Sequence, residues 1–244
     1  MAFNFANQLI AWHAEHRRTG MPWQNTRDPY AIWVSEIMLQ QTQVSTVTER
    51  YQLFMKRFPT LKSLAKAPID DVMALWSGLG YYSRARNLHR CAQIIMVEYG
   101  GEFPRTREAL ESLPGIGRST AGAIAAFAYE ERSPILDANV KRVLSRFHGI
   151  EGDLQDQKTI KELWLKAEAQ LPSVTAKMPT YTQALMDFGA TWCTPRQPKC
   201  LEAQAQCPMT RHCTAYKTKR VNEIPAKKKK SASPSFQTSI FLIQ

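Results

Sequence analysis

The sequence has no long apolar stretches, no clear strand pattern over most of its length and comparatively few acidic residues. No apolar run approaches the roughly 20 residues that a membrane-spanning helix needs. The N-terminal stretch MAFNFANQLIAWHAEHRR has the pattern of an amphipathic helix rather than of a signal sequence. We therefore expect a cytoplasmic protein. Strand-like alternation is absent before about residue 189, and no repeat of roughly 20 to 50 residues is found, so a sheet-based fold and a repeat array are both disfavoured.

The shortage of acidic residues leaves the chain basic. Asp and Glu number 21 against 32 Lys and Arg, which gives a net charge of +11 over 244 residues. A positive balance suggests a polyanionic partner such as nucleic acid, although basic proteins of other kinds are common. With 44% hydrophobic residues the chain can bury a sizeable core, in one domain or in two small ones.

Helical periodicity dominates up to about Gly189, and Gly and Pro mark short turns between modest helices, so we predict an all-α body. The clearest helical runs are IDDVMALWSGL, SRARNLHRCAQIIMVEY, STAGAIAAFAY and NVKRVLSRFHGI. After the last cysteine the composition shifts, and residues 216–234 are predicted to be a basic linker with little to bury. Residues 235–244 have the pattern of a strand that begins a second, incomplete domain.

Four of the five cysteines fall in one short segment, CTPRQPKCLEAQAQCPMTRHC, whereas Cys91 stands alone in a helical run and is expected in the core. The four are Cys193, Cys200, Cys207 and Cys213. In a reducing compartment such a cluster indicates metal binding more than disulfides.

Glu36 interrupts the apolar helical run of SEIMLQQTQV. On a helix that begins near Asp28, its neighbours one turn away are Ile32, Trp33 and Leu39, so the carboxylate points with the apolar stripe. An inward carboxylate is a candidate acid or base. The alternative is a glutamate at a helix edge whose head group reaches water.

Two further positions lie at the starts of helices. Gly115 and Gly117 in LPGIGRSTAGAIAAF permit positive φ and let a ligand come close to the N-terminus of the next helix. The positive end of the helix dipole there suits a phosphate. An ordinary turn between two helices is equally compatible with these glycines. Asp137 in SPILDANVKRVL is placed to cap a helix. Capping alone explains it, but a carboxylate held ionised by helix N–H groups also suits stabilisation of a developing cation.

Aromatic, amide and cationic residues accompany these positions. GLGYYSRARN offers Tyr81 and Tyr82 beside Arg84 and Arg86, and LQQTQV offers Gln40, Gln41 and Gln43. Such side chains can stack on bases, contact phosphates or replace base-pairing partners, although packing tyrosines and a solvated polar face are the alternatives.

The order of these motifs along the chain closely resembles the helix-hairpin-helix superfamily of DNA base-excision glycosylases, and specifically the MutY-type adenine DNA glycosylases. The resemblance runs from about Phe5 to Cys213 and rests on MPWQ, WVSEIMLQQTQV, LWSGLGYYSRARNL, LPGIGRSTAGAI, ILDANVKRVL, YTQALMDFGATWC and the cysteine segment. It implies a body over residues 1–215. A central hairpin lobe would span about 24–130, and a cluster lobe would combine the N-terminal helix with about 131–215.

This resemblance implies removal of adenine mispaired with 8-oxoguanine or guanine from double-stranded DNA, by a monomeric enzyme at the bacterial nucleoid. Glu36 matches the general acid, and Asp137 matches the carboxylate that stabilises the oxocarbenium ion at the sugar. The remaining matches are Gln41 and Tyr81 as wedge residues, Gln40, Gly115, Gly117, Ser119 and Lys141 as DNA contacts, and Trp23, Leu39 and Gln183 as the adenine pocket.

The cysteine segment resembles the 4Fe-4S site of this family but departs from its spacing. The family pattern is C-x6-C-x2-C-x5-C, whereas here the middle step is also six residues long. We expect the insertion to bulge outward and to leave four ligands in place, with zinc as the alternative. A second departure is Ala138, where the family usually has Gly.

Two other functions stay open at the sequence level. A bifunctional endonuclease III-like enzyme would carry a Schiff-base lysine at the position of Ser119, and that branch lacks a glutamate at Glu36, so both positions favour a monofunctional enzyme. A DNA-binding module without catalysis would use only the hairpin and basic residues, and its affinity would depend on salt and duplex form.

Overall fold

The computed structural model describes residues 3–202 and 206–226, and within those ranges every regular element is a helix. The α-helices are α1 (Phe5–His16), α2 (Pro29–Leu39), α3 (Val44–Arg57), α4 (Leu61–Lys66), α5 (Ile69–Leu75), α6 (Ser83–Glu98), α7 (Arg107–Glu111), α8 (Arg118–Tyr129), α9 (Ala138–His148), α10 (Gln157–Ala169), α11 (Met178–Thr191) and α12 (Thr214–Lys217). Two 3₁₀ turns, η1 (Thr175–Lys177) and η2 (Lys199–Leu201), complete the set. The predicted all-α fold class is confirmed.

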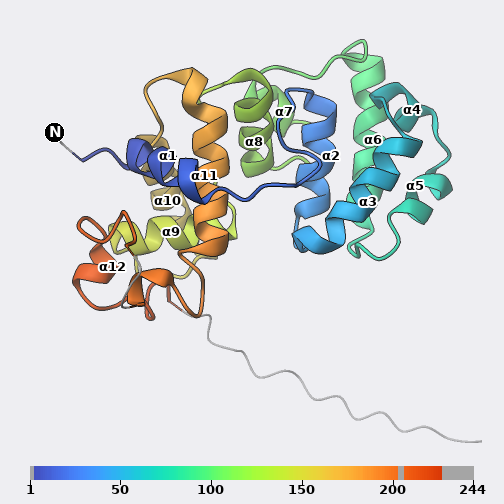
Figure 1. Cartoon of the computed structure of the whole chain (residues 1–244). Coiled ribbons are helices and arrows are strands. Elements are labelled where there is room, and N and C mark those ends of the chain that lie inside the picture. The colour runs from blue at the N-terminus through green and yellow to red at the C-terminus, as the bar shows by residue number, and fades with distance from the viewer. Residues whose placement is uncertain (1–2, 203–205, 227–244) are drawn as a thin grey trace, which may run out of the picture.

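The helices pack around two hydrophobic cores. The first core is formed by α2 to α7 with the segment around Met21 and Trp23, and it lies on the right of Figure 1. The second core joins α1 to α9, α10 and α11 on the left. In this core α1 lies against α11, although the two helices are far apart in the sequence. The lobe boundaries expected from the sequence stay a prediction.

Helix α8 lies between the cores and belongs to both. Ala121, Ile124 and Ala125 face the first core, whereas Ala123 and Ala126 face the second. Small side chains on all sides suit a helix that is packed from two directions. α8 therefore fixes the two lobes relative to each other.

Gly122, on the same helix, allows its closest packing contact. A Cβ atom at this position would lie 2.3 Å from the Pro134 carbonyl oxygen, a distance that no real Cβ contact reaches. The glycine thus lets the segment before Asp137 run directly along α8.

Local sequence signals explain where several helices start. Asp28 caps α2 through a hydrogen bond from the Tyr30 N–H, and Pro29 occupies the first helical turn, where its missing N–H costs nothing. Asp137 caps α9 and Asp156 caps α10 in the same way. Asp28 caps the helix that carries Glu36, and Asp137 is itself the cap of α9. The residues that start these two helices therefore also help to place the two carboxyl groups.

The beginning of the predicted linker is packed rather than extended. Val221 and Ile224 are buried with Ala215 in a small third cluster, against which Cys200 and Cys213 pack. Arg146 Nε donates a hydrogen bond to the Ile224 carbonyl oxygen at 3.0 Å. Apolar residues spaced among the lysines and arginines supply enough surface for this contact, so the linker prediction is wrong over 216–226. The predicted remainder of the linker and the predicted strand at 235–244 lie outside the described residues.

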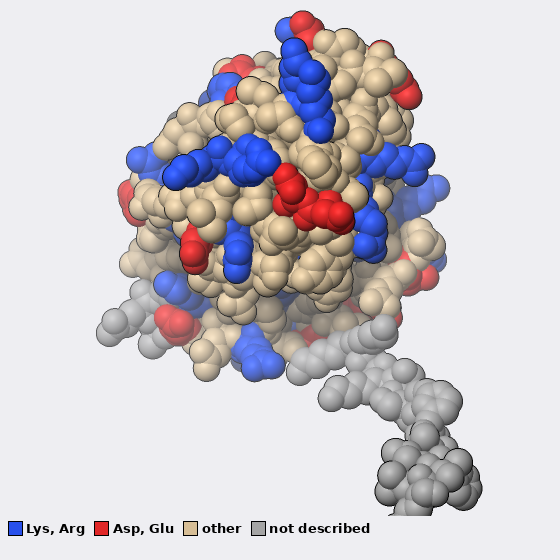
Figure 2. All heavy atoms as spheres, turned by 90° about the vertical axis from the view of Figure 1, so that its right-hand side faces the viewer, with Lys and Arg blue, Asp and Glu red and all other residues tan. Residues whose placement is uncertain are grey.

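Charge on the outer face of the first core is mixed. On the end of the molecule that faces the viewer in Figure 2, Lys and Arg side chains are spread among Asp and Glu side chains. The positive balance of the chain is therefore not gathered into one patch on this face. Within the described residues, no helix has the length and apolar character required to cross a bilayer.

Candidate active site

A large cleft lies between the two cores, with a volume of about 1340 Å³. It brings together eight of the residues predicted from the sequence, namely Trp23, Glu36, Leu39, Gln40, Gln41, Ser119, Asp137 and Gln183. Four others, Tyr81, Gly115, Gly117 and Lys141, do not line it. The cleft thus collects the predicted acid, the predicted stabilising carboxylate and the predicted base pocket in one place.

Glu36 lies on α2 and opens into the cleft with Ile32 and Leu39, whereas Trp33 is buried in the first core. Burial and, to a smaller extent, the negative charge of Asp137 together raise the pKa of the Glu36 carboxyl to about 8. A carboxyl group with this pKa holds a proton at neutral pH. It can therefore act as an acid toward a group bound in the cleft.

Asp137 sits at the N-cap of α9, where its Oδ1 accepts a hydrogen bond from the Val140 N–H at 2.8 Å. Burial raises its pKa above the ordinary value, although the N–H groups of Val140 and Asn139 and the charges of Arg142 and Lys141 act in the opposite direction. Desolvation is the largest of these effects on the Asp137 pKa. A negative charge on Asp137 raises the pKa of Glu36, so the ionisation of the two carboxyl groups is coupled.

Gln41 and Tyr81 lie on two neighbouring loops and share an unusual backbone conformation. Their φ angles are 56° and 48°, in the left-handed region that few non-glycine residues adopt. Tyr81 is 57% exposed, so its ring is available to a partner. Such conformations require support from the surrounding structure.

That support comes from Arg84, whose side chain is buried. Its guanidinium donates to the carbonyl oxygens at the end of α2 and in the loop before Tyr81, and to the hydroxyl of Thr42. The carbonyl oxygens belong to Ile37, Met38, Gln40, Leu79 and Gly80, at 2.7 to 3.2 Å. Arg84 is therefore a brace between the two loops, and the prediction that it contacts phosphate is wrong.

The two glycines of the predicted hairpin differ in backbone conformation and in the space around them. Gly115 has φ of +78°, and a Cβ there would lie 2.8 Å from the Asn87 Cβ, so only glycine fits. Gly117 has φ of −84°, and an added Cβ would meet nothing within 4 Å. The expected positive φ is thus present at Gly115 and absent at Gly117, where the open space leaves the backbone accessible from outside.

Ser119 and Lys141 both make contacts within the protein. Ser119 Oγ accepts a hydrogen bond from the Leu136 N–H at 2.9 Å, which ties the start of α8 to the residue before Asp137. Lys141 Nζ donates to the Leu154 carbonyl oxygen at 3.2 Å. Ser119 therefore helps to place Asp137.

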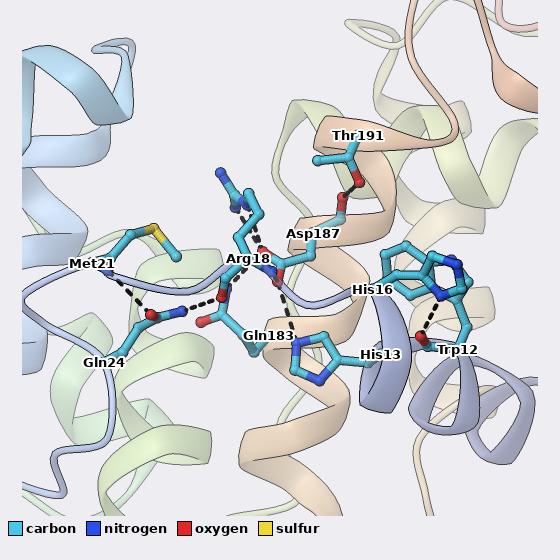
Figure 3. Close-up of polar contacts among 9 residues, drawn as sticks. All are labelled: Trp12, His13, His16, Arg18, Met21, Gln24, Gln183, Asp187 and Thr191. Atoms are coloured by element: carbon cyan, nitrogen blue, oxygen red, sulfur yellow. Dashed lines mark hydrogen bonds and ion pairs between the residues drawn. The ribbon is translucent and has the colours of Figure 1, made fainter.

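A buried carboxylate that the sequence did not single out, Asp187 on α11, lies behind the cleft wall. It meets His13 at the end of α1, Arg18 in the following segment and Gln183 one turn earlier on its own helix (Figure 3). Gln24 extends this group by donating to the Arg18 carbonyl oxygen at 2.8 Å. An acidic residue in an apolar helix, the signal that marked Glu36, would also have marked Asp187 in MDFGATWC.

The four clustered cysteines line one small apolar pocket beside the second core, which we call the cysteine pocket; Phe5, Val143, Phe147, Trp192 and Met209 are among its other lining residues. Burial raises the pKa of Cys200 to about 11 and that of Cys207 to about 12, and it also raises the pKa of Cys213. Arg146 Nη1 lies 3.4 Å from the Cys193 Sγ. Among the described side chains, no three His, Cys, Asp or Glu are arranged to hold a metal ion.

With this geometry established, comparison with known proteins defines the class. Residues 34–169 match the HhH-GPD superfamily base excision DNA repair proteins, and the chain belongs to this superfamily. It is 42% identical over 226 residues to the adenine DNA glycosylase of Buchnera aphidicola subsp. Schizaphis graminum, covering 93% of this chain and 63% of that protein. It is 40% identical over 242 residues to the adenine DNA glycosylase of Homo sapiens, covering 96% and 43%. The resemblance predicted from the sequence is confirmed.

The solved structures agree on the fold. A thermostable thymine-DNA glycosylase superposes with a TM-score of 0.77 at 31% identity, over 88% of this chain and 95% of that one. An endonuclease III in a non-covalent complex with DNA gives a TM-score of 0.69 at 19% identity, over 88% and 94%, which supports the fold alone. The chain spans less than two thirds of the Buchnera relative's length.

Proposed function

We propose that this protein is a monofunctional DNA glycosylase that excises adenine mispaired with 8-oxoguanine or guanine. The observation that carries the proposal is the pairing in one cleft of Glu36, whose pKa is raised to about 8, with Asp137. The Glu36 carboxyl is thereby protonated at neutral pH, and Asp137 is proposed to be the charged member of the pair. This combination is what hydrolysis of a glycosidic bond requires.

In the proposed reaction Glu36 gives its proton to N7 of adenine while the bond between N9 and C1′ breaks. The bonding electrons leave with the base, which departs neutral, and positive charge develops at C1′ and the ring oxygen. Asp137 stabilises that charge from the N-cap of α9. Water then adds to C1′ and its proton restores Glu36, so adenine and an abasic site are the products.

The base must leave the duplex to reach this cleft. Gln41 and Tyr81 are proposed to occupy the vacated stack, because Tyr81 is exposed and both residues sit on loops that Arg84 holds together. The open backbone at Gly117 is proposed to approach a phosphate of the strained strand. Lys141 is proposed to exchange its bond with the Leu154 carbonyl for a DNA contact.

We also propose that Cys193, Cys200, Cys207 and Cys213 hold a 4Fe-4S cluster. Four thiols around an apolar pocket provide the ligand set of such a cluster. When bound, the cluster would supply covalent ties that fix the 193–213 segment against the second core. The charge of Arg146 beside Cys193 suits a thiolate ligand.

A single-turnover assay on duplexes with adenine opposite 8-oxoguanine tests the activity. The wild type should give strand breaks at adenine only after alkali treatment, and Glu36→Gln should lower the rate by about 100-fold or more, in line with loss of a general acid. The wild-type rate should also fall as the pH rises through about 8, because Glu36 then loses its proton. Full activity of Glu36→Gln, or breaks without alkali, would contradict the proposal.

A further inference from the structure

The Asp187 side chain is fully buried, and both of its carboxylate oxygens accept hydrogen bonds. Oδ2 accepts from the His13 Nε2 at 3.2 Å and from the Arg18 main-chain N–H at 3.1 Å. Oδ1 accepts from the Arg18 Nε at 2.8 Å and from the Gln183 Nε2 at 2.9 Å. The hydrogen bonds and the Arg18 charge hold the pKa of Asp187 below its ordinary value although burial alone would raise it. The carboxylate is therefore ionised and can only accept.

An ionised Asp187 determines which way the Gln183 amide faces. A glutamine amide has a donor end and an acceptor end of nearly equal size, and only the donor end can bond to a carboxylate. The nitrogen of Gln183 must therefore lie against Asp187. Its oxygen accepts no hydrogen bond from any described residue, and Gln183 lines the cleft, so a free acceptor is presented there.

An acceptor at this place discriminates between purines. Adenine carries an amino group at position 6, which donates, whereas hypoxanthine and guanine carry an oxygen there, which accepts. Glutamine pairs with adenine through this edge of the base. A 6-oxo purine would bring two acceptors together and leave both unpaired, and a site built around a hydrogen bond strongly disfavours such a ligand.

We propose that Asp187 is a specificity-determining positioning residue, which holds the Gln183 amide oxygen toward the cleft so that the site selects 6-amino over 6-oxo purines. This inference rests on the proposed adenine excision. Asp187 touches no substrate and acts through Gln183. The bonds from His13 and Arg18 fill its remaining acceptor positions and keep the carboxylate from turning (Figure 3).

The test compares excision of adenine, hypoxanthine and unsubstituted purine, each opposite 8-oxoguanine, under single-turnover conditions. Asp187→Asn can donate as well as accept, so it no longer fixes the Gln183 amide. The variant should lower the ratio of adenine to hypoxanthine rates by about tenfold, in line with loss of one oriented hydrogen bond. Purine has no group at position 6, and its rate should change much less than that ratio.

Thr191→Val is the matched control, because the Thr191 hydroxyl donates to the main-chain oxygen of Asp187 and not to its carboxylate. Its adenine to hypoxanthine ratio should equal that of the wild type. In a Gln183→Leu background, Asp187→Asn should have no further effect on the ratio. Coupling of this kind is expected only if Asp187 acts through Gln183.

Equal loss on all three bases in folded Asp187→Asn would mean that Asp187 supports the structure alone, and the inference would be overturned. If circular dichroism shows that this variant is unfolded, Gln183→Leu carries the test, and a wild-type ratio in that variant overturns the inference as well. A wild-type protein that excises none of the three bases would instead refute the proposed function, and the inference with it.

Discussion

At the scale of single residues, Glu36 shows that the proposed acid is maintained at a cost in stability. A carboxyl group whose folded pKa is about 8 binds its proton more tightly in the folded chain than in the unfolded chain, where the value is near 4.5. Its contribution to stability is complete below pH 4.5 and is lost as the pH rises through about 8. Above that pH the folded protein contains a charge in poorly solvated surroundings.

Glu36→Gln should therefore be more stable than the wild type in alkaline solution. The amide does not titrate, so the stability difference should grow from about pH 5 to about pH 8 and then level off at a few kcal/mol. Thermal or urea unfolding at several pH values measures it. Glu49→Gln, a change at an exposed glutamate on α3, serves as the control and should show no such trend. A constant difference across the pH range would contradict the raised pKa.

At the scale of elements, Arg84 joins the end of α2 to the loop before α6. The buried guanidinium donates five hydrogen bonds to main-chain oxygens, three of them at the end of α2, and a sixth to the Thr42 hydroxyl. Arg84→Met should lower the free energy of unfolding by about 3 kcal/mol, because several buried acceptors lose their donor. The control is Arg86→Met on the same helix, where the side chain is exposed and the change should stay within about 0.5 kcal/mol. Equal effects in denaturant titrations would refute the role of Arg84 as a brace.

The two hairpin glycines provide a matched pair. Gly115→Ala should destabilise the protein by about 1 kcal/mol or more, since the backbone there is left-handed and Asn87 fills the space. Gly117→Ala should leave the melting temperature unchanged and weaken duplex DNA binding, because the new methyl group enters the open space proposed for a phosphate. Melting curves and a binding titration at fixed salt separate the two effects. Unchanged DNA affinity in Gly117→Ala would argue against a phosphate contact there.

These elements also show how far the sequence could be interpreted. The helices α6, α8 and α9 follow from periodicity, and the Asp137 cap also marks the start of α9. Glu36 was detectable as an acid on an apolar stripe. The role of Arg84 could not be predicted, because its partners are main-chain oxygens, which leave no trace in the sequence. Gly117 looked equivalent to Gly115 because φ depends on the surrounding turn. Asp187 carries the same sequence signal as Glu36, but its partners His13 and Arg18 are brought to it only by the packing of α1 against α11.

At the scale of the whole molecule, the cysteine pocket connects the last described segment to the second core. If it holds the proposed cluster, anaerobically purified protein should contain about four iron atoms and four sulfide ions per chain. Cys213→Ser should lose most of this iron and lower the melting temperature, whereas Cys91→Ser, which changes a buried thiol in the first core, should keep its iron. One zinc ion per chain, or no bound metal, would contradict the proposed cluster. Metal and sulfide analysis therefore tests the cofactor without any enzyme assay.

The arrangement of the two cores also has a consequence for synthesis on the ribosome. Residues of the first core are continuous in the chain, from Met21 to Ala125, so this lobe can fold as soon as that stretch has emerged. α1 emerges earlier still, but it lies against α11, which is made much later. Until then Trp12 lacks its native partners Phe188 and Trp192, and Phe5 at the start of the helix can meet only Phe147 of α9. The nascent chain thus exposes its first helix for most of translation, and that helix is the segment on which we expect a chaperone to act.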